Sequence, residues 1–405
     1  MKKRFVKNPF KLFGFVSFIR QLHFTFPVLV LIYQNKNVSI GDYFLIQGIY
    51  LWAILFMEVP SGYFGDLFSR RLNLAFSALL SALGCAVWLL GSGFWILLVG
   101  ELLFGFSDAF LSGTDDAYLY GLCEQYKKKN KFHLILSKQV FWAKSGFFVA
   151  ACSGAFLFYF VGANGTIFFT MFAYLIAMLC YLILPEIKEQ KRKVEGYNHL
   201  KDILSICYDT MKNRDLKIII LTFAVVSSSF AVFHWGLQPL MVENDIPVFM
   251  FSIVTGSALF AWSFWSAIAG KILEKVKFSG VINLSIFLYV LSYILVFVIC
   301  KYSENSIVYV LLPLVAFLSG NRDLSGVASS VLINHRISAE KRSTVLSVRG
   351  LLASLFRGGT LILIKPLSEV VGMQTVFLIG TLLIVPSMCF AFIAYKSNLD
   401  IKQDK

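Results

Sequence analysis

Two carboxylates within long apolar segments are the residues of this sequence best suited to proton chemistry. Glu101 and Asp108 lie two helical turns apart in one such segment. An ionised group is costly at the depth of a membrane, and groups of this kind usually mark a functional site. Asp108 and Glu101 are therefore candidates for binding and releasing a coupling ion, most simply a proton. For Asp108, a structural ion pair with Arg20 or Lys144 explains the position equally well.

Basic side chains in other apolar segments could bind a negatively charged molecule. Arg20 and His23 lie one turn apart on a shared face if their segment is a continuous helix. A histidine there could relay protons, although packing with a hydrogen bond is the more common role. Buried bases slightly outnumber buried acids, which tilts the expected ligand toward an anion, while a cavity rich in aromatic residues would suit an amphipathic compound equally. The candidate cavity residues are Arg20, His23, Arg322, Asp323 and Arg357.

Motifs for other chemistry are missing from the sequence. The glycine-rich stretches match neither a phosphate-binding loop nor a dinucleotide fingerprint. The seven cysteines are scattered without a CxxC pair or a metal-type spacing to histidine, so we interpret them as small apolar residues. We therefore expect no enzyme activity, no cofactor and no metal site.

The composition indicates that much of the chain is surrounded by lipid. Hydrophobic residues make up 58% of the sequence and charged residues only 15%, whereas soluble domains typically carry about 25% charged residues. The net charge of +14 sits in short segments between the apolar runs. That distribution is typical of membrane insertion and not of a nucleic-acid-binding face, so a nucleic-acid partner is not expected.

Apolar segments of about 20 residues predict an all-α membrane protein with twelve transmembrane helices. Basic residues alternate between the intervening loops in a way that places both termini in the cytoplasm. The first span follows a basic start without a cleavage site, so we expect it to be retained. The predicted spans are 12–33, 43–62, 73–91, 94–114, 138–161, 165–184, 217–240, 248–270, 279–300, 307–330, 344–364 and 373–395.

The two halves of the chain repeat one another, which predicts two pseudo-symmetric six-helix bundles. LeuSerGly at 111–113 recurs at 324–326 with a slightly different offset from the other matches. We expect an N-terminal bundle at 1–184, a cytoplasmic linker at 185–215 and a C-terminal bundle at 216–405. Parallel repeats of this kind build transporters around a midplane cavity. The pairs that match at one offset are Ser61 and Ser266, Gly65 and Gly270, Lys144 and Arg349, and Gly154 and Gly359.

The loop after the second span carries a family likeness. The run Gly62-Tyr-Phe-Gly-Asp66-Leu-Phe-Ser-Arg70-Arg71 resembles the loop signature of the major facilitator superfamily, and Glu58-Val-Pro60-Ser61 resembles a bacterial branch of it. The resemblance implies a charge cluster that latches two helical bundles in one conformation, although arginines that only orient the loop would also fit. The latch candidates are Gly62, Gly65, Asp66, Arg70, Arg71, Asp115 and Asp116.

The resemblance also implies how these residues are arranged. Spans one, four, seven and ten would line the central cavity, and Asp66 would face the start of the eleventh span near Ser343 and Thr344. Arg70 and Arg71 would lie near the acids that follow span four. The chain departs from the pattern at Ser69, where a glycine is usual, and at Glu101, where relatives often have an arginine linked to proton coupling.

These observations predict a secondary active transporter that moves a small solute by alternating access. The expected driving force is protons or another coupling ion. The expected setting is the bilayer of a bacterial cytoplasmic membrane, with the protein as a monomer. Efflux of amphiphilic drugs is an alternative. A membrane sensor that does not transport is another, but the longest polar stretch, 185–215, is too short for an output domain.

Overall fold

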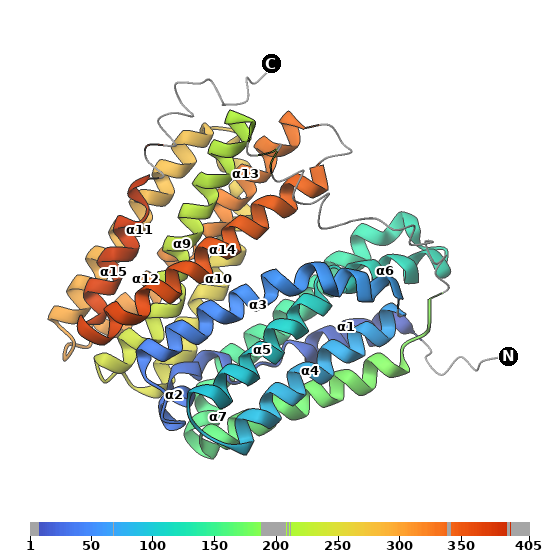
Figure 1. The fold of residues 1–405 in the computed structure, drawn as a ribbon, viewed down its shortest axis with the longest axis horizontal. Coiled ribbons are helices and arrows are strands. Elements are labelled where there is room, and N and C mark those ends of the chain that lie inside the picture. Colours follow the sequence, from blue (N-terminus) through green and yellow to red (C-terminus); the bar gives the residue numbers. More distant parts are fainter. Residues whose placement is uncertain are drawn as a thin grey trace. The chain divides into compact units, whose positions relative to one another are not determined.

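The computed structural model describes residues 8–67, 69–187, 208, 210, 212–337, 342–386 and 389, without the side chains of 59, 62–67, 343 and 344. The described residues form helices connected by short loops (Figure 1). Contacts divide the chain into two units, which we describe separately. Unit 1 combines Met1–Ser39 with Ile49–Gly196, and unit 2 combines Ile40–Gly48 with Tyr197–Lys405. The domain boundaries expected from the sequence remain a prediction.

Unit 1 holds the first six predicted spans, except that the start of α3, Ile40–Gly48, belongs to unit 2. One of its helices, α7, runs through two of them and is broken at Gly162, whose φ of 68° and ψ of −173° suit glycine alone. The break separates the spans predicted at 138–161 and 165–184. The helices are α1 (Pro9–Arg20), η1 (Phe26–Val28), α2 (Leu29–Asn35), α3 (Ile40–Leu67), α4 (Arg70–Leu90), α5 (Phe94–Leu111), α6 (Thr114–Gln125), η2 (Lys129–Lys131) and α7 (Phe132–Ile183).

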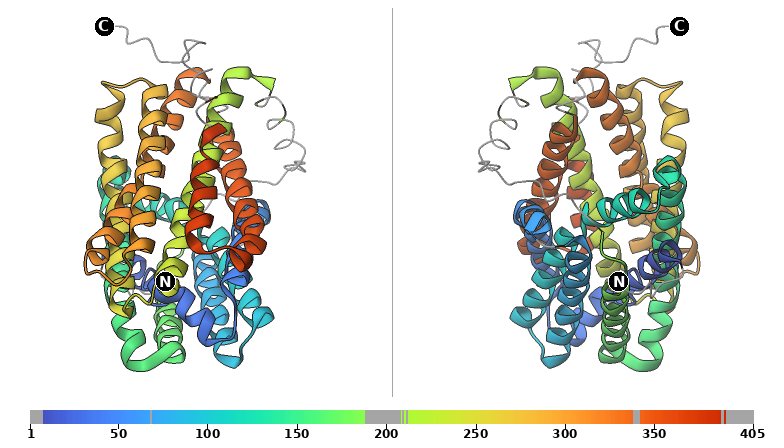
Figure 2. Two further views of the ribbon diagram at one scale, coloured as in Figure 1. Left: turned by 90° about the vertical axis from the view of Figure 1, so that its left-hand side faces the viewer. Right: turned by 90° about the vertical axis from the view of Figure 1, so that its right-hand side faces the viewer.

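Unit 2 holds the other six spans, and its helices pack side by side in a bundle (Figure 2). Eight helical segments of the described chain are long and apolar enough to cross a membrane. The prediction of an all-α membrane protein with twelve transmembrane helices is confirmed. The helices of unit 2 are α9 (Arg214–Glu243), α10 (Val248–Leu273), α11 (Phe278–Lys301), α12 (Val308–Ser319), α13 (Arg322–Arg336), α14 (Arg342–Val370) and α15 (Met373–Leu382).

Spans four and ten are broken at related sequences. Span four divides into α5 and α6 at Ser112 and Gly113, where Gly113 has a φ of 72°. Span ten divides into α12 and α13 after a second LeuSerGly run, 318–320, whereas the copy at 324–326 lies inside α13. The break therefore favours 318–320 as the true repeat of 111–113.

Small residues on α7 allow α1 and the segment after it to approach closely. Ala150 is fully buried on this face. A side chain added at Gly146 would overlap the carbonyl oxygen of Phe18, and one added at Gly154 would overlap that of Phe24. Close approach over a stripe of small residues is a common way to pack helices in a membrane, where lipid provides no hydrophobic driving force.

We expect the Gly146→Ala substitution to lower the free energy of unfolding by about 1–3 kcal/mol, because the added methyl group meets backbone that cannot move aside. The matched control is Gly270→Ala in α10, since nothing lies within 4 Å of the added carbon there. Alanine favours a helix over glycine, so the control should keep or raise the melting temperature. Thermal unfolding of both purified variants measures the difference, and an unchanged Gly146→Ala midpoint would contradict the packing.

Candidate functional site

Arg20, the last residue of α1, is the centre of a polar cluster in unit 1. Its side chain is 6% exposed. Its Nη2 donates hydrogen bonds to Ser81 Oγ of α4 at 3.0 Å and to Ser107 Oγ of α5 at 2.7 Å. Its guanidinium carbon lies 4.6 Å from the centre of the Tyr174 ring of α7, within cation–π range. One guanidinium thus joins four helices.

Asp108 of α5 borders this cluster and remains accessible. Its Oδ1 lies 3.8 Å from Arg20 Nη2, and its Oδ2 accepts a hydrogen bond from the Tyr50 hydroxyl of α3 at 2.6 Å. The Asp108 side chain is 42% exposed. Of the two partners considered from the sequence, Arg20 is therefore adjacent to Asp108, and the carboxylate has one ionic and one phenolic neighbour.

Glu101, one of the two candidate coupling acids, is enclosed more deeply than Asp108. The residue is 5% exposed, and its Oε1 accepts a hydrogen bond from the Tyr33 hydroxyl at 2.8 Å. A carboxylate in this setting has a polar partner inside the protein. It exchanges protons with water less readily than an exposed group.

His23 does not share a helical face with Arg20, and that expectation was wrong. The helix α1 ends at Arg20, and His23 lies in the loop before η1. The reason is Pro27, which has no N–H to donate to the His23 carbonyl and whose ring would clash with it in a continuous helix. The His23 ring contacts those of Phe104 and Tyr174, with centroids 5.7 and 5.9 Å away, which favours a packing role.

The latch candidates are only partly described. Arg70 Nη1 donates to the carbonyl of Ala117 at 2.8 Å, next to Asp116 in α6. Arg71 Nη1 instead donates to the Leu184 carbonyl at 3.1 Å, just past the end of α7. Cations are favourable at helix C-termini, so this bond stabilises the end of α7. Asp115 and Asp116 lie in the first turn of α6.

The other latch contacts lie outside the described residues. Gly62, Gly65 and Asp66 belong to the backbone of α3, but their side chains are not described. The expected neighbours of Asp66, Ser343 and Thr344, lie in α14, and their side chains are not described either. The proximity of Asp66 to the start of span eleven stays a prediction.

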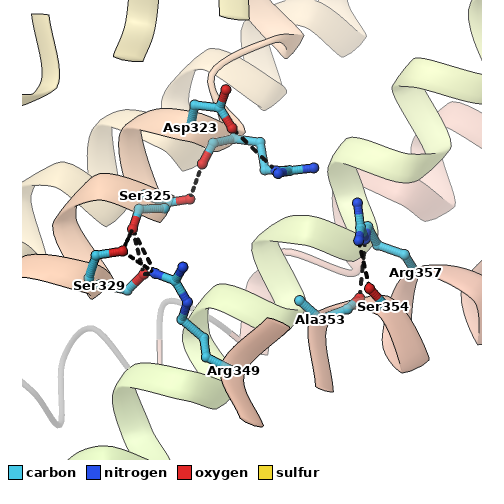
Figure 3. Close-up of polar contacts among 10 residues, drawn as sticks. Asp323, Ser325, Ser329, Arg349, Ala353, Ser354 and Arg357 are labelled. Carbon is cyan, nitrogen blue, oxygen red and sulfur yellow. Dashed lines mark hydrogen bonds and ion pairs between the residues drawn. The ribbon is translucent and has the colours of Figure 1, made fainter. Parts of the chain in front are cut away.

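Arg322 and Asp323 occupy the first turn of α13 and form an ion pair, with 3.5 Å between Arg322 Nε and Asp323 Oδ1. The Arg322 guanidinium lies 5.2 Å from the Phe230 ring centre of α9. Arg357 of α14 donates from Nη2 to Ser354 Oγ at 2.8 Å and from Nε to the Ala353 carbonyl at 3.3 Å (Figure 3). Three predicted cavity residues thus lie on α13 and α14 of unit 2.

Arg349 of α14 belongs with this group, although it was not among the predicted cavity residues. Its Nη1 donates to the Gly326 carbonyl at 2.8 Å, to Ser329 Oγ at 2.7 Å and to Ser330 Oγ at 2.6 Å (Figure 3). The sequence did offer a signal, because Arg349 is a charge within predicted span eleven and matches Lys144 in the repeat. The family resemblance directed most attention to spans one, four, seven and ten, and Arg357 was the one predicted cavity residue on span eleven.

The partners of the charged residues were also missed. These partners are the hydroxyl groups and rings of serines and tyrosines. Nothing in their sequence spacing distinguishes them from the ordinary serines and tyrosines of membrane helices. They are recognisable only once the helices that carry them pack together. The residues are Tyr33, Tyr50, Ser81, Ser107, Tyr174, Ser329, Ser330 and Ser354.

Comparison with known proteins gives a consistent result. The family model of the Major Facilitator Superfamily matches residues 12–361. A mutant of the nucleoside transporter NupG is similar in structure, with a TM-score of 0.83, 15% identity, and coverage of 96% of this chain and 99% of that chain. A bacterial homolog to the human lysosomal transporter Spinster has a TM-score of 0.70 at 11% identity, covering 98% of this chain and 97% of that one.

A third similar structure is the POT family transporter PepTSo, with a TM-score of 0.73, 12% identity, and coverage of 96% of this chain and 97% of that one. A search of curated proteins found no match. At these identities, the structural likeness establishes the fold alone.

The Arg20–Asp108 contact leads to a prediction for a double-mutant cycle. We expect Arg20→Gln to destabilise the protein, because it leaves Asp108 without its cation. Adding Asp108→Asn should restore part of the loss, with a coupling free energy of about 0.5–3 kcal/mol. Combining Arg20→Gln with Asp245→Asn, at an exposed position after α9, should be additive. Chemical denaturation of the purified variants measures all the terms, and additivity at Arg20 and Asp108 would refute the contact.

Proposed function

The chain belongs to the major facilitator superfamily, and on that premise we propose that it is a proton-coupled secondary transporter that moves a small solute by alternating access. The observation that supports this proposal most directly is the position of Asp108, an accessible carboxylate that contacts both Arg20 and Tyr50. A group of this kind can bind a proton from one side of the membrane and release it to the other. Its charge then changes during the cycle.

The surroundings of Arg20 allow Asp108 to change its charge at low cost. When Asp108 takes up a proton, the guanidinium loses an ionic partner. It still keeps the hydroxyls of Ser81 and Ser107 and the ring of Tyr174. The buried cation is therefore never left without partners, a state that would be expensive in a membrane. Protonation can then bias the balance between two conformations by a differential free energy.

Asp108 is a better coupling residue than Glu101. Asp108 is 42% exposed, whereas Glu101 is 5% exposed and bound to Tyr33. A coupling acid must reach water in at least one state of the cycle. We therefore assign coupling to Asp108 and a structural role to Glu101.

The basic end of unit 1 supports a cytoplasmic N-terminus. Phe10, near the start of α1, packs against Tyr126 with ring centroids 5.7 Å apart, and Lys128 Nζ lies 4.8 Å from the Phe10 ring. Arg70 and Arg71 bind the neighbouring ends of α6 and α7. The positive-inside rule assigns an end with this many cations to the cytoplasm. We propose both termini there, in a bacterial cytoplasmic membrane, and a monomer.

We also propose that the same end works as a conformational latch. Arg70 and Arg71 tie the start of α4 to α6 and to the end of α7. Breaking these bonds would release carbonyl groups that need another donor, so the tied arrangement is a discrete state. The proposed latch residues are Gly62, Gly65, Asp66, Arg70, Arg71, Asp115 and Asp116.

Flux into liposomes tests the proposed transport directly. The purified chain is reconstituted, a pH gradient is imposed, and a defined mixture of small metabolites is quantified in the lumen by mass spectrometry. We expect at least one solute to depart from equal concentrations across the membrane, and a protonophore to abolish this. Lumenal contents identical to those of protein-free liposomes would count against transport.

We expect Asp108→Asn to abolish gradient-driven accumulation while exchange of labelled for unlabelled solute persists. The amide retains the shape of the side chain but cannot carry a proton through the cycle. The matched control is Asp245→Asn, an exposed residue with a φ of 50° that asparagine adopts as readily. The control should accumulate solute like the parent protein. Full accumulation by Asp108→Asn would remove Asp108 from the coupling role.

A further inference from the structure

Polar atoms without hydrogen bonds gather around the break between α12 and α13. Trp262 borders the break, because a carbon added at Gly320 would lie 3.3 Å from its Cδ1. Asn321 is fully buried at the start of α13. Among the described residues, no hydrogen-bond partner is found for the buried atoms Asn321 Oδ1, Trp262 Nε1, Arg322 Nε and Arg349 Nε. Buried polar atoms usually have partners, so unpaired atoms at the break and, in Arg349, beside the following turns of α13 favour a ligand in this region.

Arg349 presents an unused edge of its guanidinium. All three of its hydrogen bonds leave from one nitrogen, Nη1, and all three acceptors are neutral. Within the described part of the chain, no carboxylate lies within 4.0 Å of Arg349. The Nε and Nη2 atoms form the edge that binds a carboxylate or phosphate in bidentate fashion. No hydrogen bond to the described residues uses Nε, so this edge of Arg349 lacks a polar partner.

Arg322 is a second cation whose positive charge is only partly balanced by its neighbour Asp323. Its Nε lies 3.5 Å from Asp323 Oδ1 but makes no hydrogen bond there. The side chain is 31% exposed, so a solute could reach it. The Arg322 guanidinium lies beside the Phe230 ring on which His234 stacks, and Arg349 binds α13 one to two turns beyond Arg322. Asp323 pairs with Arg322, and Arg349 has no carboxylate within 4.0 Å among the described residues, so positive charge is in excess here and is costly within a membrane unless an anion balances it.

Aromatic rings on α9 and α10 line the same region. The Arg349 guanidinium lies 4.7 Å from the Phe223 ring centre, and that of Arg322 lies 5.2 Å from Phe230. His234 stacks on Phe230 at 5.2 Å with an interplanar angle of 7°, and it lies 5.2 Å from Trp262. These rings hold both guanidinium groups in place and offer flat surfaces beside them. A planar molecule with an anionic substituent matches this combination.

We propose that Arg322 and Arg349 bind the anionic group, a carboxylate or a phosphate, of a solute with a planar ring. Trp262 Nε1 donates to a second acceptor of the solute, and Asn321 Oδ1 accepts from it. This inference rests on the proposed transport function for its biological meaning, but the binding itself does not depend on it. Arg349 thereby gains a role beyond packing, because its hydrogen bonds to Gly326, Ser329 and Ser330 use Nη1 alone.

Matched pairs of probes test the inference by thermal stabilisation of the purified full chain, since a ligand that binds the folded state raises its melting temperature. The pairs are benzoate with benzamide, and adenosine monophosphate with adenosine, and inorganic phosphate is tested alone. We expect the anionic member of at least one pair to stabilise the protein and its neutral partner to have no effect at equal concentration. Benzoate and the nucleotide distinguish a carboxylate from a phosphate, and inorganic phosphate shows whether the ring is needed.

Variants locate the binding site. We expect Arg322→Gln and Arg349→Gln each to weaken the apparent affinity for the stabilising anion about 10-fold or more, because a charge-assisted hydrogen bond is lost. The matched control is Arg342→Gln, an exposed arginine two turns earlier on α14, which should bind like the parent protein. Arg349→Lys keeps the positive charge but lacks the paired N–H groups of the guanidinium. Its affinity for the anion should fall between those of Arg349→Gln and the parent protein. Melting temperatures measured without ligand show whether each variant folds. If Arg349→Gln does not fold, the affinity of Arg349→Lys tests the role of Arg349 instead.

Two results would overturn the inference. One is equal stabilisation by the anionic and neutral members of every pair. The other is an anion effect that survives unchanged in Arg322→Gln, Arg349→Gln and Arg349→Lys. Liposome flux separates this failure from failure of the transport proposal. Accumulation of neutral solutes only would support transport and contradict the anion site. Arginine-dependent anion binding without any flux would support the anion site and contradict transport.

Discussion

Every ionised side chain inside a bilayer must find its polar partners within the protein, and this constraint organises the structure. Arg20 satisfies it with hydroxyls from α4 and α5, a ring from α7 and the carboxylate of Asp108. The helices of unit 1 are thereby joined at a point where lipid-like packing alone would give little specificity. Because several of these partners are neutral, the cluster tolerates a change in the charge of Asp108. On the proposed function, a structural requirement and a coupling mechanism would use the same residues.

Unit 2 meets the same requirement less completely, and the difference between the halves is informative. Lys144 and Arg349 match in the sequence repeat, yet Lys144 is exposed while Arg349 is partly buried against α13. Arg349 is satisfied by a carbonyl and two serines, none of which carries a charge. The two halves share a fold but differ in the burial of this matched cation, which suits them to different roles. The acid that we propose to change charge is in unit 1, and the partly compensated arginines are in unit 2.

Hydropathy and charge predicted the helices because both follow from the energetics of a bilayer, which acts on each segment separately. The all-α fold with twelve transmembrane helices was predicted this way, and Arg20 was one of the two partners considered for Asp108. Contacts between helices could not be predicted, because they depend on packing that periodicity does not encode. The hydroxyls of Ser81 and Ser107 are examples. The misplacement of His23 had a local cause, since α1 ends at Arg20 and Pro27 cannot donate the hydrogen bond that a continuous helix would give to the His23 carbonyl.

The breaks in spans four and ten show why the charge of Arg322 needs an explanation beyond stability. The first turn of α6 carries Asp115 and Asp116, and acids are favourable at the positive end of a helix dipole. The first turn of α13 carries Arg322 and Asp323 instead. An arginine at the positive end of a helix is unfavourable, and Asp323 offsets only part of that cost because its contact with Arg322 is 3.5 Å long. A bound anion would be stabilised by the helix end and by the arginine together, so this position of Arg322 favours an anionic ligand although it costs stability by itself.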